Sequence, residues 1–202
     1  MLDALLRPLK ERCLIPVATV IGRRIAPMTV TVTAFAAGMG AAAFAAHGSY
    51  SIALGLWALN RTLDGLDGTL ARVQDTQSDL GGYVDLLLDF AVYAAIPVGF
   101  ALGVGSRAAF VATLALLASF YVNAASWMYL AAVLERRDTG ARARGELTTI
   151  TMPPGLVGGT ETLLFYTAFF LFPGYLVPLV WLMAALVVLT VLQRVAWAVR
   201  RL

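Results

Sequence analysis

The chain has 202 residues, of which 60% are hydrophobic and 13% are charged, and its formal net charge is +3. A soluble domain of this length has too little interior to bury so many apolar side chains, so the composition excludes an ordinary soluble protein. No basic stripe with interleaved aromatic residues is present, so we expect no nucleic-acid partner and attribute the positive charge to contact with anionic membrane lipids.

The first predicted element is an amphipathic helix over residues 2 to about 13, whose leucines share one face while its charged residues lie elsewhere. This pattern is typical of a helix that lies in the membrane interface, although a solvated helix packed on its own protein would show it too. We assign residues 1–26 to this N-terminal segment. Cys13 is the single cysteine of the sequence, which excludes an intramolecular disulfide and a thiolate metal cluster.

Residues 27–202 form the second predicted unit, an all-α integral membrane domain with six transmembrane helices. The expected spans are Thr29 to Ala46, Ile52 to Leu70, Leu80 to Leu102, Ala108 to Leu134, Thr160 to Phe172, and Tyr175 to Val199. The three short turns on one side contain a single basic residue, Arg107, whereas the other side is rich in arginine. The positive-inside rule therefore predicts that both termini lie in the cytoplasm.

Two features between the spans have open interpretations. The segment from Glu135 to Gly159 is the only long cytoplasmic connection, and it would serve either as a substrate lid or as an ordinary positive-inside loop. Gly99 and Gly103 form a small-xxx-small pair that would support either helix packing within the monomer or a homodimer.

Four aspartates occur where the second span ends and the third begins. Asp64 and Asp67 share one helical face with Gly68, Ala71 and Arg72, because these residues are spaced at i, i+3, i+4, i+7 and i+8. In the next span, Gly81, Asp85 and Asp89 follow one another at intervals of four. Two consecutive antiparallel helices thus present two carboxylates each, near the cytoplasmic side.

The negative charge of the carboxylates must be balanced by nearby cations, because a charged side chain at the centre of a membrane helix costs about 2.5 to 3.5 kcal/mol on insertion scales. Arg61 and Arg72 are too few to neutralise four acids. Divalent cations such as Mg²⁺, Mn²⁺ or Ca²⁺ suit an all-oxygen donor set, and a pair of them could bind a pyrophosphate. A structural salt-bridge network or a cation pathway would account for the acids as well.

The pattern Asp64, Asp67-Gly68, Ala71-Arg72, Gly81, Asp85 and Asp89 resembles the signature of the CDP-alcohol phosphotransferases at every defined position. The resemblance implies a six-span enzyme of the bacterial inner membrane, with a cytoplasmic active site. Such an enzyme would transfer a substituted phosphate group, typically phosphatidyl, from a CDP-linked donor such as CDP-diacylglycerol to an acceptor alcohol. CMP would be released, and the product would belong to phospholipid biosynthesis.

The same resemblance assigns roles to individual residues. Asp64, Asp67 and Asp85 would bind two divalent cations, Mg²⁺ or Mn²⁺, and Asp89 would be a further ligand or the general base. Donor contacts are expected from these residues: Thr31, Asp64, Gly68, Ala71, Arg72 and Gly81. Met28 stands where the family often has Asn, so the resemblance does not carry over one polar contact to the nucleotide.

The acceptor alcohol has only weak candidates in the sequence. Asn123 and Ser126 lie one turn apart on the fourth span and would bind it or form interhelical hydrogen bonds. Arg142 and Arg144 would bind a phosphorylated acceptor or would be plain loop charges, and Glu161 begins the fifth span. Outside the transferase class, a divalent-cation transporter or a non-catalytic membrane scaffold is the alternative hypothesis.

Overall fold

The computed structural model describes residues 13–137 and 155–202, and every regular element in these two ranges is a helix. Residues 13–21 are helical and lead into the short 3-10 helix η1 (Gly22–Arg24). The helices after it are α2 (Pro27–Ala46), α3 (Tyr50–Gln74), α4 (Asp79–Val104), α5 (Arg107–Arg136), α7 (Gly159–Leu171), η2 (Pro173–Tyr175) and α8 (Leu176–Arg201). The predicted interfacial helix, apart from Cys13, lies outside the described residues, as do Arg142 and Arg144.

Each of the six predicted spans coincides with one helix, so the all-α architecture is confirmed. In the described part of the chain, four helices are long and apolar enough to cross a membrane, namely α2, α4, α5, and α8 together with η2. Helix α3 is long enough, but its four charged side chains, from Arg61 onward, lower its hydropathy. Helix α7 has 13 residues, which is about 20 Å of helix and shorter than a bilayer core. Six crossings therefore stay a prediction.

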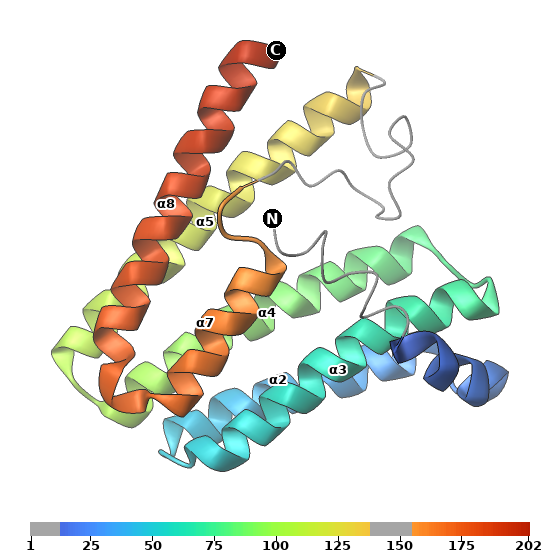
Figure 1. Cartoon of the computed structure of the whole chain (residues 1–202), viewed down its shortest axis with the longest axis horizontal. Coiled ribbons are helices and arrows are strands. Elements are labelled where there is room, and N and C mark those ends of the chain that lie inside the picture. The colour runs from blue at the N-terminus through green and yellow to red at the C-terminus, as the bar shows by residue number, and fades with distance from the viewer. Residues whose placement is uncertain (1–12, 138–154) are drawn as a thin grey trace.

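The helices form two groups joined by α7 (Figure 1). Helix α2 packs along α3 and α4, and α5 packs along α8. Helix α7 contacts α3 on one side and α8 on the other, while α4 also contacts α5. The two groups meet at the end that carries the α2–α3, α4–α5 and α7–α8 turns, and they diverge toward the opposite end (Figure 1).

Close approach of α4 to α2 depends on two glycines. A Cβ atom at Gly99 would lie 2.2 Å from the carbonyl oxygen of Ala42, and one at Gly103 would lie 2.3 Å from that of Ala45. Distances this short cannot be relieved by side-chain rotation, because the atoms they meet are backbone. Of the two interpretations of this glycine pair, the structure shows packing within the monomer, so a homodimer through the same glycines would have to displace α2.

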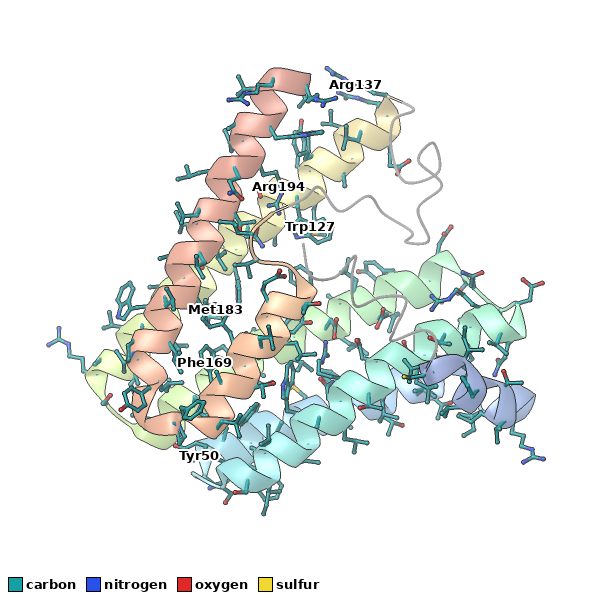
Figure 2. All side chains as sticks on the ribbon, viewed as in Figure 1. Tyr50, Trp127, Arg137, Phe169, Met183 and Arg194 are labelled. Carbon is teal, nitrogen blue, oxygen red and sulfur yellow. The ribbon has the colours of Figure 1, made fainter. Side chains whose placement is uncertain are left out.

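The core between the groups is aromatic. Trp57, Phe100, Tyr166 and Phe169 are each at most 2% exposed, and the Tyr166 ring lies 5.4 Å from both the Trp57 and the Phe169 rings, centroid to centroid. Figure 2 shows Phe169 facing α8 from the lower part of α7. This cluster packs α7 against α3 and α4, next to the part of α3 that carries its charged residues.

Candidate active site

Three acidic residues of α3 and α4 line the same small cavity. Asp64 of α3 and both Asp85 and Asp89 of α4 line it, together with Thr31 of α2 and the apolar side chain of Val92. The predicted convergence of acids from two neighbouring helices is therefore present for three of the four aspartates. The cavity lies in the part of the molecule where α2, α3 and α4 pack together.

Asp67, the fourth aspartate, is held beside this cavity. Its side chain is 5% exposed, and its Oδ2 accepts a hydrogen bond of 2.7 Å from the Thr31 hydroxyl. Its Oδ1 accepts a second hydrogen bond from the backbone N–H of Gly68. Thr31 was expected to contact the donor nucleotide, and in the structure it orients a predicted metal ligand.

Arg61 is the cation within the acid cluster, and its guanidinium is held from several sides. Its Nη2 donates to Asp89 Oδ1 at 2.6 Å, and its Nη1 lies 3.6 Å from Asp64 Oδ2. The same Nη1 donates to the Tyr93 hydroxyl, and Nε donates to the side-chain oxygen of Asn60. Asn60 in turn donates to the carbonyl of Ala34, which ties the network to α2.

These residues suit a divalent cation by chemistry and by placement. The donors are carboxylate oxygens, which Mg²⁺ and Mn²⁺ prefer, and three of them border one cavity. In the described ranges no three acidic, histidine or cysteine side chains yet surround a single point. Arg61 lies between Asp64 and Asp89 instead.

The remaining predicted donor residues lie on either side of the acids. A Cβ at Gly68 would meet only the end of the Arg72 side chain, at 3.7 Å, so this position leaves room on the acid-bearing face. Arg72 donates to the hydroxyl of Thr69 on its own helix. The N–H of Gly81 donates to the side chain of Ser78, which caps α4. Ala71 is half-buried beside Arg72.

The residues that were candidates for binding the acceptor alcohol have different contacts in the structure. Glu161 accepts a hydrogen bond from the N–H of Gly158, so it caps the start of α7. Asn123 and Ser126 both accept hydrogen bonds from Nη1 of Arg194, at 2.9 and 2.6 Å. Arg194 was not singled out in the sequence, although a lone arginine within an apolar span is itself a signal of function.

Arg194 is a buried cation of α8, 6% exposed, and it lies between α8 and α5 (Figure 2). Its Nε has no hydrogen-bond partner and no ion pair joins it to an acid within residues 13–137 and 155–202. Burying a cation in this way is costly unless an anion joins it. Nearby, a Cβ at Gly155 would lie 3.3 Å from Arg194 Nη2, so the backbone entering α7 passes close to this guanidinium.

The described residues form an all-helical fold with several membrane-capable helices, and three of its carboxylates border one cavity. Residues 24–193 match the family described as CDP-alcohol phosphatidyltransferase, and the chain belongs to this family. It is therefore a transferase of phospholipid biosynthesis, as the signature of acids indicated.

Curated relatives agree with this assignment. The chain is 35% identical over 190 residues to the inner membrane protein YnjF of Escherichia coli, covering 94% of this chain and 89% of that one. A shorter stretch of 77 residues is 36% identical to the CDP-diacylglycerol--serine O-phosphatidyltransferase of Mycobacterium bovis, covering 38% of this chain and 27% of the relative.

Among solved structures, the fold is similar to that of phosphatidylinositol phosphate synthase (PgsA1) of Mycobacterium tuberculosis. The structure of that enzyme with CDP-DAG bound superposes with a TM-score of 0.72 at 21% identity, and the match covers 92% of each chain. Its complex with manganese and citrate gives a TM-score of 0.71 at 21% identity, over 91% of this chain and 87% of that one.

Proposed function

We propose that this enzyme transfers the phosphatidyl group of CDP-diacylglycerol to an alcohol that carries an anionic group, with release of CMP. The observation that carries the proposal is the cavity bordered by Asp64, Asp85 and Asp89, with Asp67 held beside it by Thr31. The manganese and the CDP-DAG seen in structures of the similar mycobacterial enzyme support the choice of cofactor and donor.

Each acid has a proposed part in the reaction. Two divalent cations, Mg²⁺ or Mn²⁺, would be held by Asp64, Asp67, Asp85 and Asp89 and would supply charge stabilisation to the diphosphate. Asp89 would accept the proton of the acceptor hydroxyl, whose oxygen attacks the β-phosphorus as the bond to CMP breaks. Thr31 keeps Asp67 oriented through its hydrogen bond, so that this carboxylate is preorganised for binding.

The acceptor is proposed to bind at Arg194. Its guanidinium suits a phosphate, which it can hold through two parallel hydrogen bonds. Asn123 and Ser126 fix Nη1, so the side chain is already oriented without a ligand. Glycerol 3-phosphate and inositol phosphate are acceptors of this kind.

The proposed location is the bacterial inner membrane, with six crossings and both termini in the cytoplasm. The relative YnjF is an inner membrane protein. In Figure 1 the α3–α4 turn and the C-terminus both lie away from the three short turns, at the right and at the top of the view. This arrangement supports an active site that opens on the arginine-rich side.

The first experiment supplies purified protein with CDP-diacylglycerol, Mn²⁺ and a panel of alcohols. CMP release and the mass of the lipid product are measured. We expect CMP release only when metal and a phosphorylated alcohol are both present. The Asp67→Ala variant is expected to bind both the metal and the CDP-diacylglycerol donor more weakly, and its rate of CMP release should fall at least about a hundredfold. Metal flux into proteoliposomes without any nucleotide requirement, and no CMP with any alcohol, would support the transporter alternative instead.

A second experiment tests the acceptor site. Arg194→Met is expected to raise the KM for the phosphorylated acceptor about tenfold to a hundredfold, because one charge-assisted pair is lost. The KM for CDP-diacylglycerol should stay within about twofold of wild type. Arg137→Met is the matched control, since Arg137 is exposed at the end of α5. Equal KM values for the acceptor in wild type, Arg194→Met and Arg137→Met would show that Arg194 does not bind the acceptor.

A further inference from the structure

The guanidinium of Arg61 is held by aromatic rings as well as by its contacts with the acids. Its guanidinium carbon lies 4.8 Å from the Trp57 ring centroid and 5.1 Å from the Tyr93 ring centroid. Its side chain is only 10% exposed. Together with the hydrogen bonds to Asn60, Tyr93 and Asp89, these ring contacts fix the guanidinium in one place.

This fixed position lies within the acid cluster. Nη2 of Arg61 donates a hydrogen bond to Asp89 Oδ1, and its Nη1 lies 3.6 Å from Asp64 Oδ2. One cation therefore bridges an acid of α3 and an acid of α4. A divalent cation that binds these carboxylates has to do so beside a positive charge that cannot move away, since the aromatic rings and Asn60 retain it. Two like charges within a few ångströms repel each other strongly at a half-buried site.

We propose that Arg61 is a built-in counter-cation of this site, which holds one oxygen of Asp89 in place and weakens the binding of divalent cations to the acid cluster. The proposal deepens the function proposed above, because it concerns the same carboxylates. It accounts for how Asp64 and Asp89 remain close together before a metal binds.

The experiment measures Mn²⁺ binding, in the absence of nucleotide, by the decrease of the free Mn²⁺ signal in electron paramagnetic resonance. Two variants remove the charge in different ways. Arg61→Met keeps an apolar stem between the Trp57 and Tyr93 rings, and Arg61→Gln keeps a polar end for Asn60. Both are expected to bind Mn²⁺ roughly tenfold more tightly than wild type, or more, because a neighbouring like charge has been removed.

Arg107→Gln is the control, since it removes the same charge from an exposed position at the start of α5. Its Mn²⁺ affinity should match that of wild type. Circular dichroism and gel filtration identify which Arg61 variants are folded, and a single folded variant is sufficient for the test. A purely structural role for Arg61 would lower the melting temperature without tightening Mn²⁺ binding.

Mn²⁺ affinity that is equal to or weaker than wild type in the folded Arg61 variants overturns the proposal. CMP release by wild type is measured separately, so the two proposals fail in different ways. Absence of CMP release would contradict the transferase and leave the Mn²⁺ comparison valid, whereas unchanged Mn²⁺ affinity with normal CMP release contradicts the role of Arg61 alone.

Discussion

Asp89→Asn is expected to lower the rate of CMP release by about two to four orders of magnitude while leaving the protein folded. The amide cannot accept the proton of the acceptor hydroxyl, and it is a weaker ligand for a hard cation. Folding should survive, because the amide oxygen of Asn can still accept the hydrogen bond that Arg61 Nη2 now donates to Asp89. The measurement is CMP release from CDP-diacylglycerol at saturating Mn²⁺, with circular dichroism as the test of folding.

Asp79→Asn is the matched control, because Asp79 is an exposed acid on the same helix, in the first turn of α4. It should retain activity within about twofold, as expected for a surface change remote from the cavity. If Asp89→Asn were as active as this control, Asp89 would have no part in proton transfer, and the general base would have to be sought elsewhere.

The positions of the acids on the helices could be predicted from the sequence, because helical periodicity alone decides which residues share a face. Asp64 and Asp67 are three residues apart, and Asp85 and Asp89 are four apart, so each pair shares one side of its helix. A turn of four residues between α3 and α4 forces these helices to be neighbours. The presence of two acids on each of two neighbouring helices therefore follows from local rules, and the structure contains a cavity lined by three of them.

The partners of Arg61 could not be predicted in the same way. Tyr93 is 32 residues away and Asp89 is 28 residues away, and their meeting depends on how α3 and α4 are rotated about their axes. Asn60 reaches Ala34, 26 residues earlier, for the same reason. Arg194 is a stronger case, since its partner Asn123 is 71 residues away on α5. Long-range polar contacts of this kind leave no periodic pattern in the sequence.

Helix α7 shows a second limit of sequence-based prediction. An apolar run was expected to give a span from Thr160 to Phe172, and the helix has nearly these bounds. Its length was therefore predictable, but its place between the two helix groups was not. That place depends on tertiary contacts, such as the hydrogen bond from Trp57 Nε1 to the Thr167 hydroxyl and the one from the Tyr166 hydroxyl to the Tyr93 carbonyl.

Gly99→Val is expected to have the largest effect on folding. The new Cβ would lie 2.2 Å from the carbonyl oxygen of Ala42, and this backbone atom cannot move unless α2 shifts away from α4. Overpacking of a well-packed contact costs about 1–3 kcal/mol, and a clash with backbone belongs at the upper end of that range or beyond. The same shift would displace Thr31 of α2, which orients Asp67, so residual folded protein should also bind Mn²⁺ less tightly.

The control for this prediction is Gly55→Val on α3, where an added Cβ would meet no atom within 4 Å. Both substitutions place a β-branched residue in a helix, so any difference between them reports the contact with α2 and not helix propensity. Thermal unfolding followed by fluorescence-detected gel filtration should show a clearly lower melting temperature for Gly99→Val alone. Equal melting temperatures for the two variants would mean that α4 does not approach α2 as closely as the glycines indicate, and that the position of Thr31 is set by other contacts.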